Sequence, residues 1–140
     1  LGVIHYGKQS INQDDINAVV DVLKSDFLTQ GPKVAEFEQD LANYCSAKYA
    51  KAISNGAAAL HVAYLAVGLK SGDTVWTTPN TFVATANAAL YCGAKVDFVD
   101  IDPMTYNMSI ESLEKKLIQA KKKETLPKIQ ITVHFTGQSC

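Results

Sequence analysis

The stretch ISNGAAALHVAYLAVGL (residues 53–69) places an Asn-Gly pair between a short apolar run and a long alanine-rich run. Asn55 and Gly56 predict a tight turn, because glycine has no Cβ and tolerates positive φ. Ala57 and Ala58 then open a helix with little side chain over its first N–H groups. Free N–H groups and the positive end of the helix dipole favour an anion, typically a phosphate. On this stretch alone, an ordinary turn from strand to helix is the favoured interpretation.

The same alternation of a short apolar run with a helical segment continues along the chain. The predicted strands are residues 51–54, 74–77, 95–99 and 129–133, and the predicted helices between them are residues 57–68, 81–92 and 109–122. This order predicts an α/β fold with a mainly parallel sheet and flanking helices. In the last strand, Gln130, Thr132 and His134 alternate with apolar residues. We therefore expect these three polar side chains to face a cavity or a solvated edge.

The first 50 residues follow a different pattern. Residues 1–11 are expected to form an extended arm. Asn12 and Asp15 have the spacing of a capping box and predict a helix start. Pro32 suits the first turn of a second helix, because its missing N–H would have no partner there.

Composition and charge exclude several classes of protein. Hydrophobic residues make up 47% and charged residues 19% of the chain, which is typical of a soluble globular protein. A net charge of −1 disfavours a nucleic-acid surface. With neither a signal peptide nor a long apolar run, no membrane partner is expected. Cys45, Cys92 and Cys140 are odd in number and far apart, so a reducing cytoplasm is predicted rather than a disulfide framework.

Ligands of open parallel sheets bind beyond the carboxyl ends of the strands. Phe82, at one such end, is interpreted either as a plate for a cofactor ring or as a core anchor of its helix. Asp100 and Asp102 suggest either a metal pair or a turn; the turn is favoured and no metal site is predicted, because no third ligand is near. His134 is interpreted as an acid, a base, a contact to a ligand ring or a structural residue. The motifs of serine hydrolases, P-loop NTPases and dinucleotide-binding proteins are absent from the sequence.

Four segments carry a resemblance to a known family. They are LTQGPKVAEFE (residues 28–38), SNGAAALHVA (54–63), TPNTFVATANAALYCGAKVDFVDIDPMTYN (78–107) and VHFTGQ (133–138). The chain resembles the sugar aminotransferases of the DegT/DnrJ/EryC1/StrS family, which use pyridoxal 5'-phosphate (PLP). Within the family it is most similar to the C4-aminotransferases of the pseudaminic-acid pathway, which aminate a UDP-linked 4-keto-6-deoxy-N-acetyl-hexosamine. The resemblance implies the front part of a fold-type I PLP-dependent transferase large domain, with residues 12–140 as its incomplete N-terminal part.

The resemblance also implies roles for particular residues. Gly56, Ala57 and Ala58 would hold the cofactor phosphate, and Phe82 would lie against the pyridine ring. Ala57 stands where the commoner family version has threonine, which removes a hydroxyl donor and leaves the backbone contacts. All 13 basic residues are lysines, so a phosphate here would rely on backbone N–H groups rather than on a guanidinium. The residues expected to contact substrate are Tyr6, Asp26, Phe27, Leu28, Thr29 and Gly56.

The family's Schiff-base lysine and the acid that pairs with the pyridine nitrogen lie downstream of the HFTGQ segment. We therefore expect no catalytic residue within these 140 residues, and we expect them to be inactive alone, with apolar faces and strand edges left exposed. The full-length protein is expected to be a homodimer that moves an amino group from an amino acid, glutamate being favoured, to C4 of the sugar. The alternatives are a perosamine-type aminotransferase, a PLP sugar dehydratase with histidine in place of the lysine, and a non-catalytic α/β binding fragment.

Overall fold

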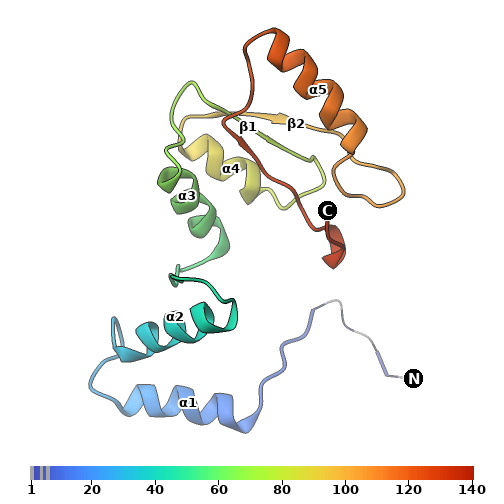
Figure 1. The fold of residues 1–140 in the computed structure, drawn as a ribbon. Coiled ribbons are helices and arrows are strands. Elements are labelled where there is room, and N and C mark those ends of the chain that lie inside the picture. The colour runs from blue at the N-terminus through green and yellow to red at the C-terminus, as the bar shows by residue number, and fades with distance from the viewer. Residues whose placement is uncertain (1, 4, 6) are drawn as a thin grey trace. The chain divides into compact units, whose positions relative to one another are not determined.

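The computed structural model describes residues 2, 3, 5 and 7–140, which divide into two compact units, Leu1–Ala52 and Ile53–Cys140. In chain order the elements are α1 (Gln13–Lys24), α2 (Pro32–Tyr44), α3 (Gly56–Ala66), β1 (Thr74–Thr77), α4 (Ala84–Tyr91), β2 (Lys95–Phe98), α5 (Ile110–Lys122), β3 (Ile129–Gln130) and a short 3-10 helix, η1 (Phe135–Gly137) (Figure 1). Among the described residues, no helix is long and apolar enough to cross a membrane. The predicted boundary after residue 11 stays a prediction.

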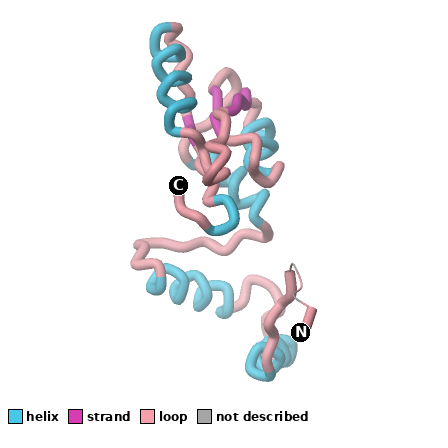
Figure 2. Tube along the Cα trace, turned by 90° about the vertical axis from the view of Figure 1, so that its right-hand side faces the viewer, coloured by secondary structure: helices cyan, strands magenta, loops and turns pink. Residues whose placement is uncertain are grey.

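The second unit, Ile53–Cys140, is built on a parallel sheet with the strand order β2-β1-β3. Successive side chains of the central strand β1 point to opposite faces. Val75 packs on one face with residues of α3 and α4, and Trp76 packs on the other with residues of α5. Helices therefore cover both faces of the sheet, as Figures 1 and 2 show. This arrangement confirms the predicted α/β class.

Small side chains allow α4 to approach the sheet closely. Ala88 and Ala89 are fully buried and pack with Tyr64 and Val75 in one cluster. The cluster on the opposite face is formed by Trp76, Val99, Met108 and Ala120. The alanine-rich sequence of α4 therefore serves close packing between the helix and the sheet.

The structure corrects several predicted element boundaries. Residues 51–54 do not form a strand, because the described residues offer this run no neighbouring strand with which to pair its N–H and C=O groups. The strand predicted at 129–133 is assigned only at Ile129–Gln130. The helix predicted at 81–92 begins at Ala84, so Phe82 lies in the turn before it. Predicted strand 74–77 is confirmed at both ends.

The first unit, Leu1–Ala52, has two helices whose ends follow the predicted chemistry. The Asn12 side chain accepts hydrogen bonds from the N–H groups of Asp14 and Asp15, and the Asp15 carboxylate accepts from the Asn12 N–H, which completes the capping box. Pro32 is in the first turn of α2. Of the described residues of this unit only Ala42 is buried, and apolar side chains such as Val19 are largely exposed. The prediction of exposed apolar faces is confirmed here.

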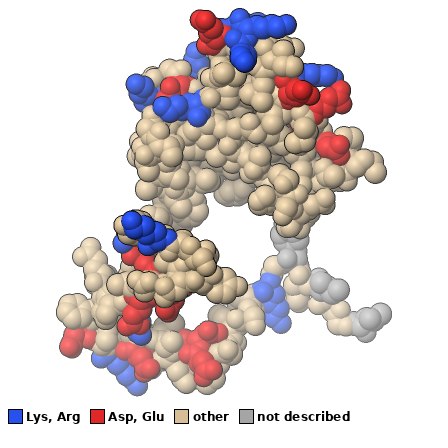
Figure 3. Space-filling model, viewed as in Figure 1, with Lys and Arg blue, Asp and Glu red and all other residues tan. Residues whose placement is uncertain are grey.

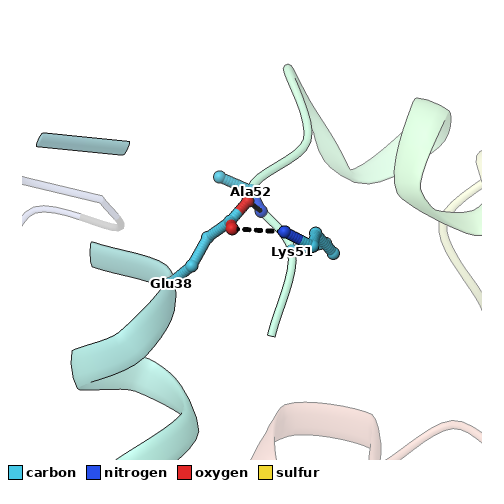
Figure 4. Close-up of polar contacts among 3 residues, drawn as sticks. All are labelled: Glu38, Lys51 and Ala52. Atoms are coloured by element: carbon cyan, nitrogen blue, oxygen red, sulfur yellow. Dashed lines mark hydrogen bonds and ion pairs between the residues drawn. The ribbon is translucent and has the colours of Figure 1, made fainter. Parts of the chain in front are cut away.

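A carboxylate ties α2 to the end of this unit. Glu38, whose side chain is 17% exposed, accepts a hydrogen bond from Lys51 Nζ at 2.6 Å and from the Ala52 N–H at 3.0 Å (Figure 4). The Lys51 hydrogen bond, followed by that from Ala52, holds the pKa of the Glu38 carboxyl below its usual range. The ionised form of Glu38 is therefore the one that fixes residues 51 and 52.

This pKa shift predicts a pH dependence of stability. Because the pKa of Glu38 is lower in the folded state, its contribution is present above the ordinary glutamate pKa, about 4.3, and is lost as pH falls through the lowered value. We expect Glu38→Gln to lower the urea midpoint at neutral pH, with the difference from wild type shrinking below about pH 4. Glu114→Gln, at an exposed position of α5, is the matched control. A wild-type midpoint for Glu38→Gln at neutral pH would contradict this role.

Candidate functional site

The anion seat was predicted at the N-terminus of α3, and the structure corrects two features of that prediction. Asn55 has φ −167° and is the N-cap, and Gly56 is the first helical residue, so the predicted turn with positive φ is wrong. Asn55 Oδ1 accepts a hydrogen bond from the Ala58 N–H at 2.9 Å, so this amide is not free. An asparagine N-cap supplies the acceptor that alanine cannot.

Two donors remain at this helix end. The N–H groups of Gly56 and Ala57 belong to the first turn, where no intrahelical acceptor exists, and the described residues supply them with none. A Cβ added at Gly56 would meet nothing within 4 Å, so the space beside its backbone is open. This end of α3 can accommodate an anion that accepts hydrogen bonds from both amides.

Phe82 lies in the turn between β1 and α4 with its side chain 77% exposed. This exposure excludes the core-anchor interpretation within the described unit. The hydroxyls of Thr81 and Thr85 lie 3.0 Å apart, and this hydrogen bond joins the turn to the first residues of α4. The ring is thus available to a ligand at the carboxyl end of β1.

Tyr64 connects the helix of the anion seat with the helix that follows Phe82. Its buried hydroxyl donates to the Thr85 carbonyl at 2.9 Å, and burial raises the pKa of this phenol. His61 packs edge-on against Tyr91, with ring centroids 5.6 Å apart, so it is a packed residue of α3. These contacts hold α3 and α4 in one body. No local pattern predicts the hydrogen bond of Tyr64, because its partner is a backbone carbonyl 21 residues away.

The aspartates after β2 build a turn. Asp102 Oδ1 accepts hydrogen bonds from the N–H groups of Met104 and Thr105 at 2.8 and 2.9 Å. These bonds, the one from Thr105 first, hold the pKa of Asp102 below its usual range. Asp100 Oδ1 accepts from the Ile101 N–H. The turn interpretation is therefore confirmed for this pair.

The strand at the edge of the sheet borders a cleft. Gln130, Thr132 and His134 are all exposed and line a cleft of about 440 Å³ together with Asn107. β3 is an edge strand, so the prediction that these polar residues face a cavity or a solvated edge is confirmed. His134 Nδ1 accepts a hydrogen bond from the Cys140 N–H at 3.0 Å.

Two buried hydroxyls at the end of β1 lack partners. Thr77 and Thr78 are almost completely buried, and their Oγ1 atoms have no hydrogen-bond partner among the described residues. An unpaired buried hydroxyl costs free energy, so packing of the described unit does not explain these side chains. They mark the carboxyl end of β1, where the Phe82 turn begins, as a place with unused hydrogen-bonding capacity.

A second cleft, of about 340 Å³, lies between the sheet and α5. Lys116 lines it, but its ammonium group is bonded to Asp97 at 2.7 Å and lies 4.8 Å from the centre of the Trp76 ring. Figure 3 shows charged side chains of both signs along the upper part of this unit on the visible face, both over α5 and away from it. Lys116 therefore already has partners within this unit. This cleft differs from the predicted ligand site, which lies beyond the carboxyl ends of the strands.

The predicted substrate residues lie mainly in the first unit. The turn between α1 and α2 carries four exposed residues, namely Asp26, Phe27, Leu28 and Thr29. A Cβ at Gly31 would lie 2.9 Å from Phe27 Cβ, so this turn closes only around a glycine. Tyr6 lies outside the described residues. Gly56 and Phe82 belong to the second unit, and the substrate contacts stay predictions.

Comparison with known proteins identifies the family. The model of the DegT/DnrJ/EryC1/StrS aminotransferase family matches residues 9–140. A UDP-4-amino-4,6-dideoxy-N-acetyl-beta-L-altrosamine transaminase from Campylobacter jejuni is 46% identical over 84% of this chain and 31% of the relative. A GDP-perosamine synthase from Caulobacter vibrioides is 42% identical over 79% of this chain and 28% of the relative. The chain thus spans about a third of the length of these relatives.

Solved structures agree with this assignment. PseC from Helicobacter pylori, an aminotransferase involved in the biosynthesis of pseudoaminic acid, matches 97% of this chain and 35% of its own, with a TM-score of 0.86 and 30% identity. A Streptococcus pneumoniae protein solved in PLP and PMP forms matches 98% of this chain and 33% of its own, with a TM-score of 0.84 and 27% identity. Aminotransferases of this family depend on PLP. The chain belongs to the DegT/DnrJ/EryC1/StrS aminotransferase family.

Proposed function

We propose that this sequence is a part of a PLP-dependent aminotransferase that acts on a nucleotide-linked keto-sugar. The observation that carries the proposal is the open α3 N-terminus, where Gly56 and Ala57 present two N–H groups without acceptors. This helix end fits a phosphate group, because its N–H groups and the helix dipole both favour an anion. The chain has no arginine that could bind the phosphate with a guanidinium group, since all of its basic residues are lysines. The exposed ring of Phe82 fits the aromatic part of the same cofactor.

The residues of this chain would bind and orient rather than catalyse. When bound, PLP supplies a carrier for the amino group and a ring that accepts electrons. Gly56 and Ala57 would hold the phosphate through their amides, and Ala58 would contribute only if Asn55 released its N–H. Phe82 would cover one face of the ring and exclude water from it. The lysine that binds the cofactor covalently would come from outside these 140 residues, as would the acid beside the ring nitrogen.

The substrate proposed is a UDP-linked 4-keto-6-deoxy-N-acetyl-hexosamine, aminated at C4 with glutamate as donor. The altrosamine transaminase from Campylobacter jejuni and the PseC structure support this choice. Tyr6 and the turn at residues 26–29 would contact the sugar nucleotide. The similarity to the GDP-perosamine synthase favours a perosamine-type precursor as the second candidate. A homodimer and a cytoplasmic location are parts of the same proposal.

The test uses the full-length protein that contains this sequence. We expect purified protein to take up PLP with a visible absorbance band, and borohydride to attach the cofactor to a lysine irreversibly. With glutamate, the UDP-linked keto-sugar should gain an amine at C4, measured by mass spectrometry, and its GDP-linked counterpart should react more slowly. PLP uptake without attachment to a lysine by borohydride, and without an amine at C4 of the product, would indicate the dehydratase. Protein that takes up no PLP would contradict the proposal and favour a binding role.

A further inference from the structure

Asn107, in the loop between β2 and α5, holds a segment that lies about thirty residues further along the chain. Asn107 is buried, with 6% of the residue exposed. Nδ2 donates to the carbonyls of Gln138 and Ser139 at 3.3 and 3.1 Å, and Oδ1 accepts from the Phe135 N–H at 3.1 Å. Two carbonyls on one side and an N–H on the other also fix which way the carboxamide points. All of these bonds go to the main chain of residues 135–139, so their effect is to fix that backbone.

The loop that carries Asn107 is itself held in place. The Asn107 carbonyl accepts from the Asp102 N–H at 2.9 Å, and the Asp102 carboxylate closes the turn on Met104 and Thr105. Met108, the next residue, forms a bridge with Ile101. Asn107 therefore lies in a loop whose backbone is fixed by its own hydrogen bonds.

The hydrogen bonds from Asn107 to residues 135–139 are here called the clamp, and the backbone on both sides of it has a conformation that its residues rarely adopt. Tyr106 has φ 60° and Thr136 has φ 54°, both in the left-handed region, and neither is a glycine. The rings of Tyr106 and Phe135 contact each other with centroids 5.9 Å apart. Non-glycine residues stay in this region only where their surroundings hold them there, and such sites gather near functional positions.

The clamped segment, residues 135–139, follows β3 at the end of the sheet where the turn with Phe82 follows β1. β3 is parallel to β1, with Gln130 opposite Trp76, and the Ile131 N–H continues the ladder to the Trp76 carbonyl at 2.9 Å. The carboxyl ends of two neighbouring parallel strands lie at the same end of the sheet. We propose that Asn107 is a positioning residue of the ligand site, which fixes residues 135–139 so that they form part of the wall beside the cofactor. This inference rests on the proposed function.

The test compares variants of the full-length protein by two measurements. Asn107→Asp keeps the acceptor for the Phe135 N–H but removes both donors and places a carboxylate oxygen against two carbonyls. A neutral hydrogen bond corresponds to about a two- to tenfold factor in equilibrium. In cofactor-free protein, we expect hydrogen exchange to accelerate severalfold in peptides covering residues 134–139, with β1 and α4 unchanged. The dissociation constant for PLP should rise about two- to tenfold.

Two further variants make the test specific. Asn17→Asp, on the exposed face of α1, is the matched control and should match wild type in both measurements. Thr136→Gly permits the left-handed backbone without strain, so adding it to Asn107→Asp should recover part of the PLP affinity. If Asn107→Asp unfolds, Asn107→Ala is measured in its place.

The outcomes separate this inference from the proposed function. Unchanged exchange at residues 134–139 in the Asn107 variants would overturn the clamp, and faster exchange with wild-type PLP affinity would overturn its positioning role. Absence of PLP binding by the wild-type protein would instead refute the proposed function and, with it, the role of Asn107 toward this cofactor, while the exchange result would still decide whether the clamp exists.

Discussion

Replacing Gly56 by proline should weaken PLP binding about 10- to 100-fold while α3 still forms. Proline is tolerated at the first helical position, and Asn55 already has the extended backbone that proline requires of its predecessor. The substitution removes one of the two free N–H donors. A hydrogen bond to a charged group contributes roughly 1.5–3 kcal/mol, which gives the expected factor. The measurement is titration of the cofactor-free full-length protein with PLP, followed by absorbance.

Gly56→Ala is the matched control for this substitution. It keeps the N–H group, and its Cβ would meet no atom of the described residues within 4 Å. We expect unchanged thermal stability and a smaller loss of affinity than with proline. Circular dichroism of both variants checks that the helix content is retained. Wild-type affinity for the proline variant would show that the amide of Gly56 does not bind the phosphate.

Phe82→Ala should weaken PLP binding about tenfold with almost no change in stability. A stacked aromatic pair is worth roughly 0.5–1.5 kcal/mol beyond the area that it buries, and PLP would lose both contributions. The side chain is largely exposed in the described unit, so its removal should change the free energy of unfolding by less than about 0.5 kcal/mol. A core anchor would instead cost about 3–5 kcal/mol.

Phe82→Tyr retains the ring and should retain PLP affinity. The pair of variants separates the loss of an aromatic surface from a general disturbance of the turn between β1 and α4. Affinity and the urea midpoint are measured in parallel on the full-length protein. A large loss of stability with unchanged PLP affinity would return Phe82 to the role of a core anchor.

Local patterns in the sequence predicted the second unit well. Val75 and Trp76 alternate as a strand covered on both faces requires, and strand 74–77 has its predicted ends. The predicted start of the first helix at Asn12 was correct because capping depends on neighbouring residues. The run 51–54 was misjudged because a strand depends on its neighbours in space.

Side chains with distant partners could not be predicted. Asn55 is compatible with both a left-handed turn and an N-cap. Only the structure shows that it is the N-cap of α3 and accepts a hydrogen bond from the Ala58 N–H. Tyr64, Glu38 and Asn107 bond to main-chain groups 14 to 32 residues away, which no local pattern indicates. For Phe82 the sequence supplied two interpretations; its exposure argues against the core anchor within the described unit, and its contact with the cofactor ring stays a prediction.

The most direct test of the account is a crystal structure of the full-length protein with PLP. We predict that phosphate oxygens will accept hydrogen bonds from the N–H groups of Gly56 and Ala57 at about 2.7–3.2 Å, with the Phe82 ring against the pyridine. A phosphate bound at another part of the protein, with these two amides left to water, would contradict the central claim.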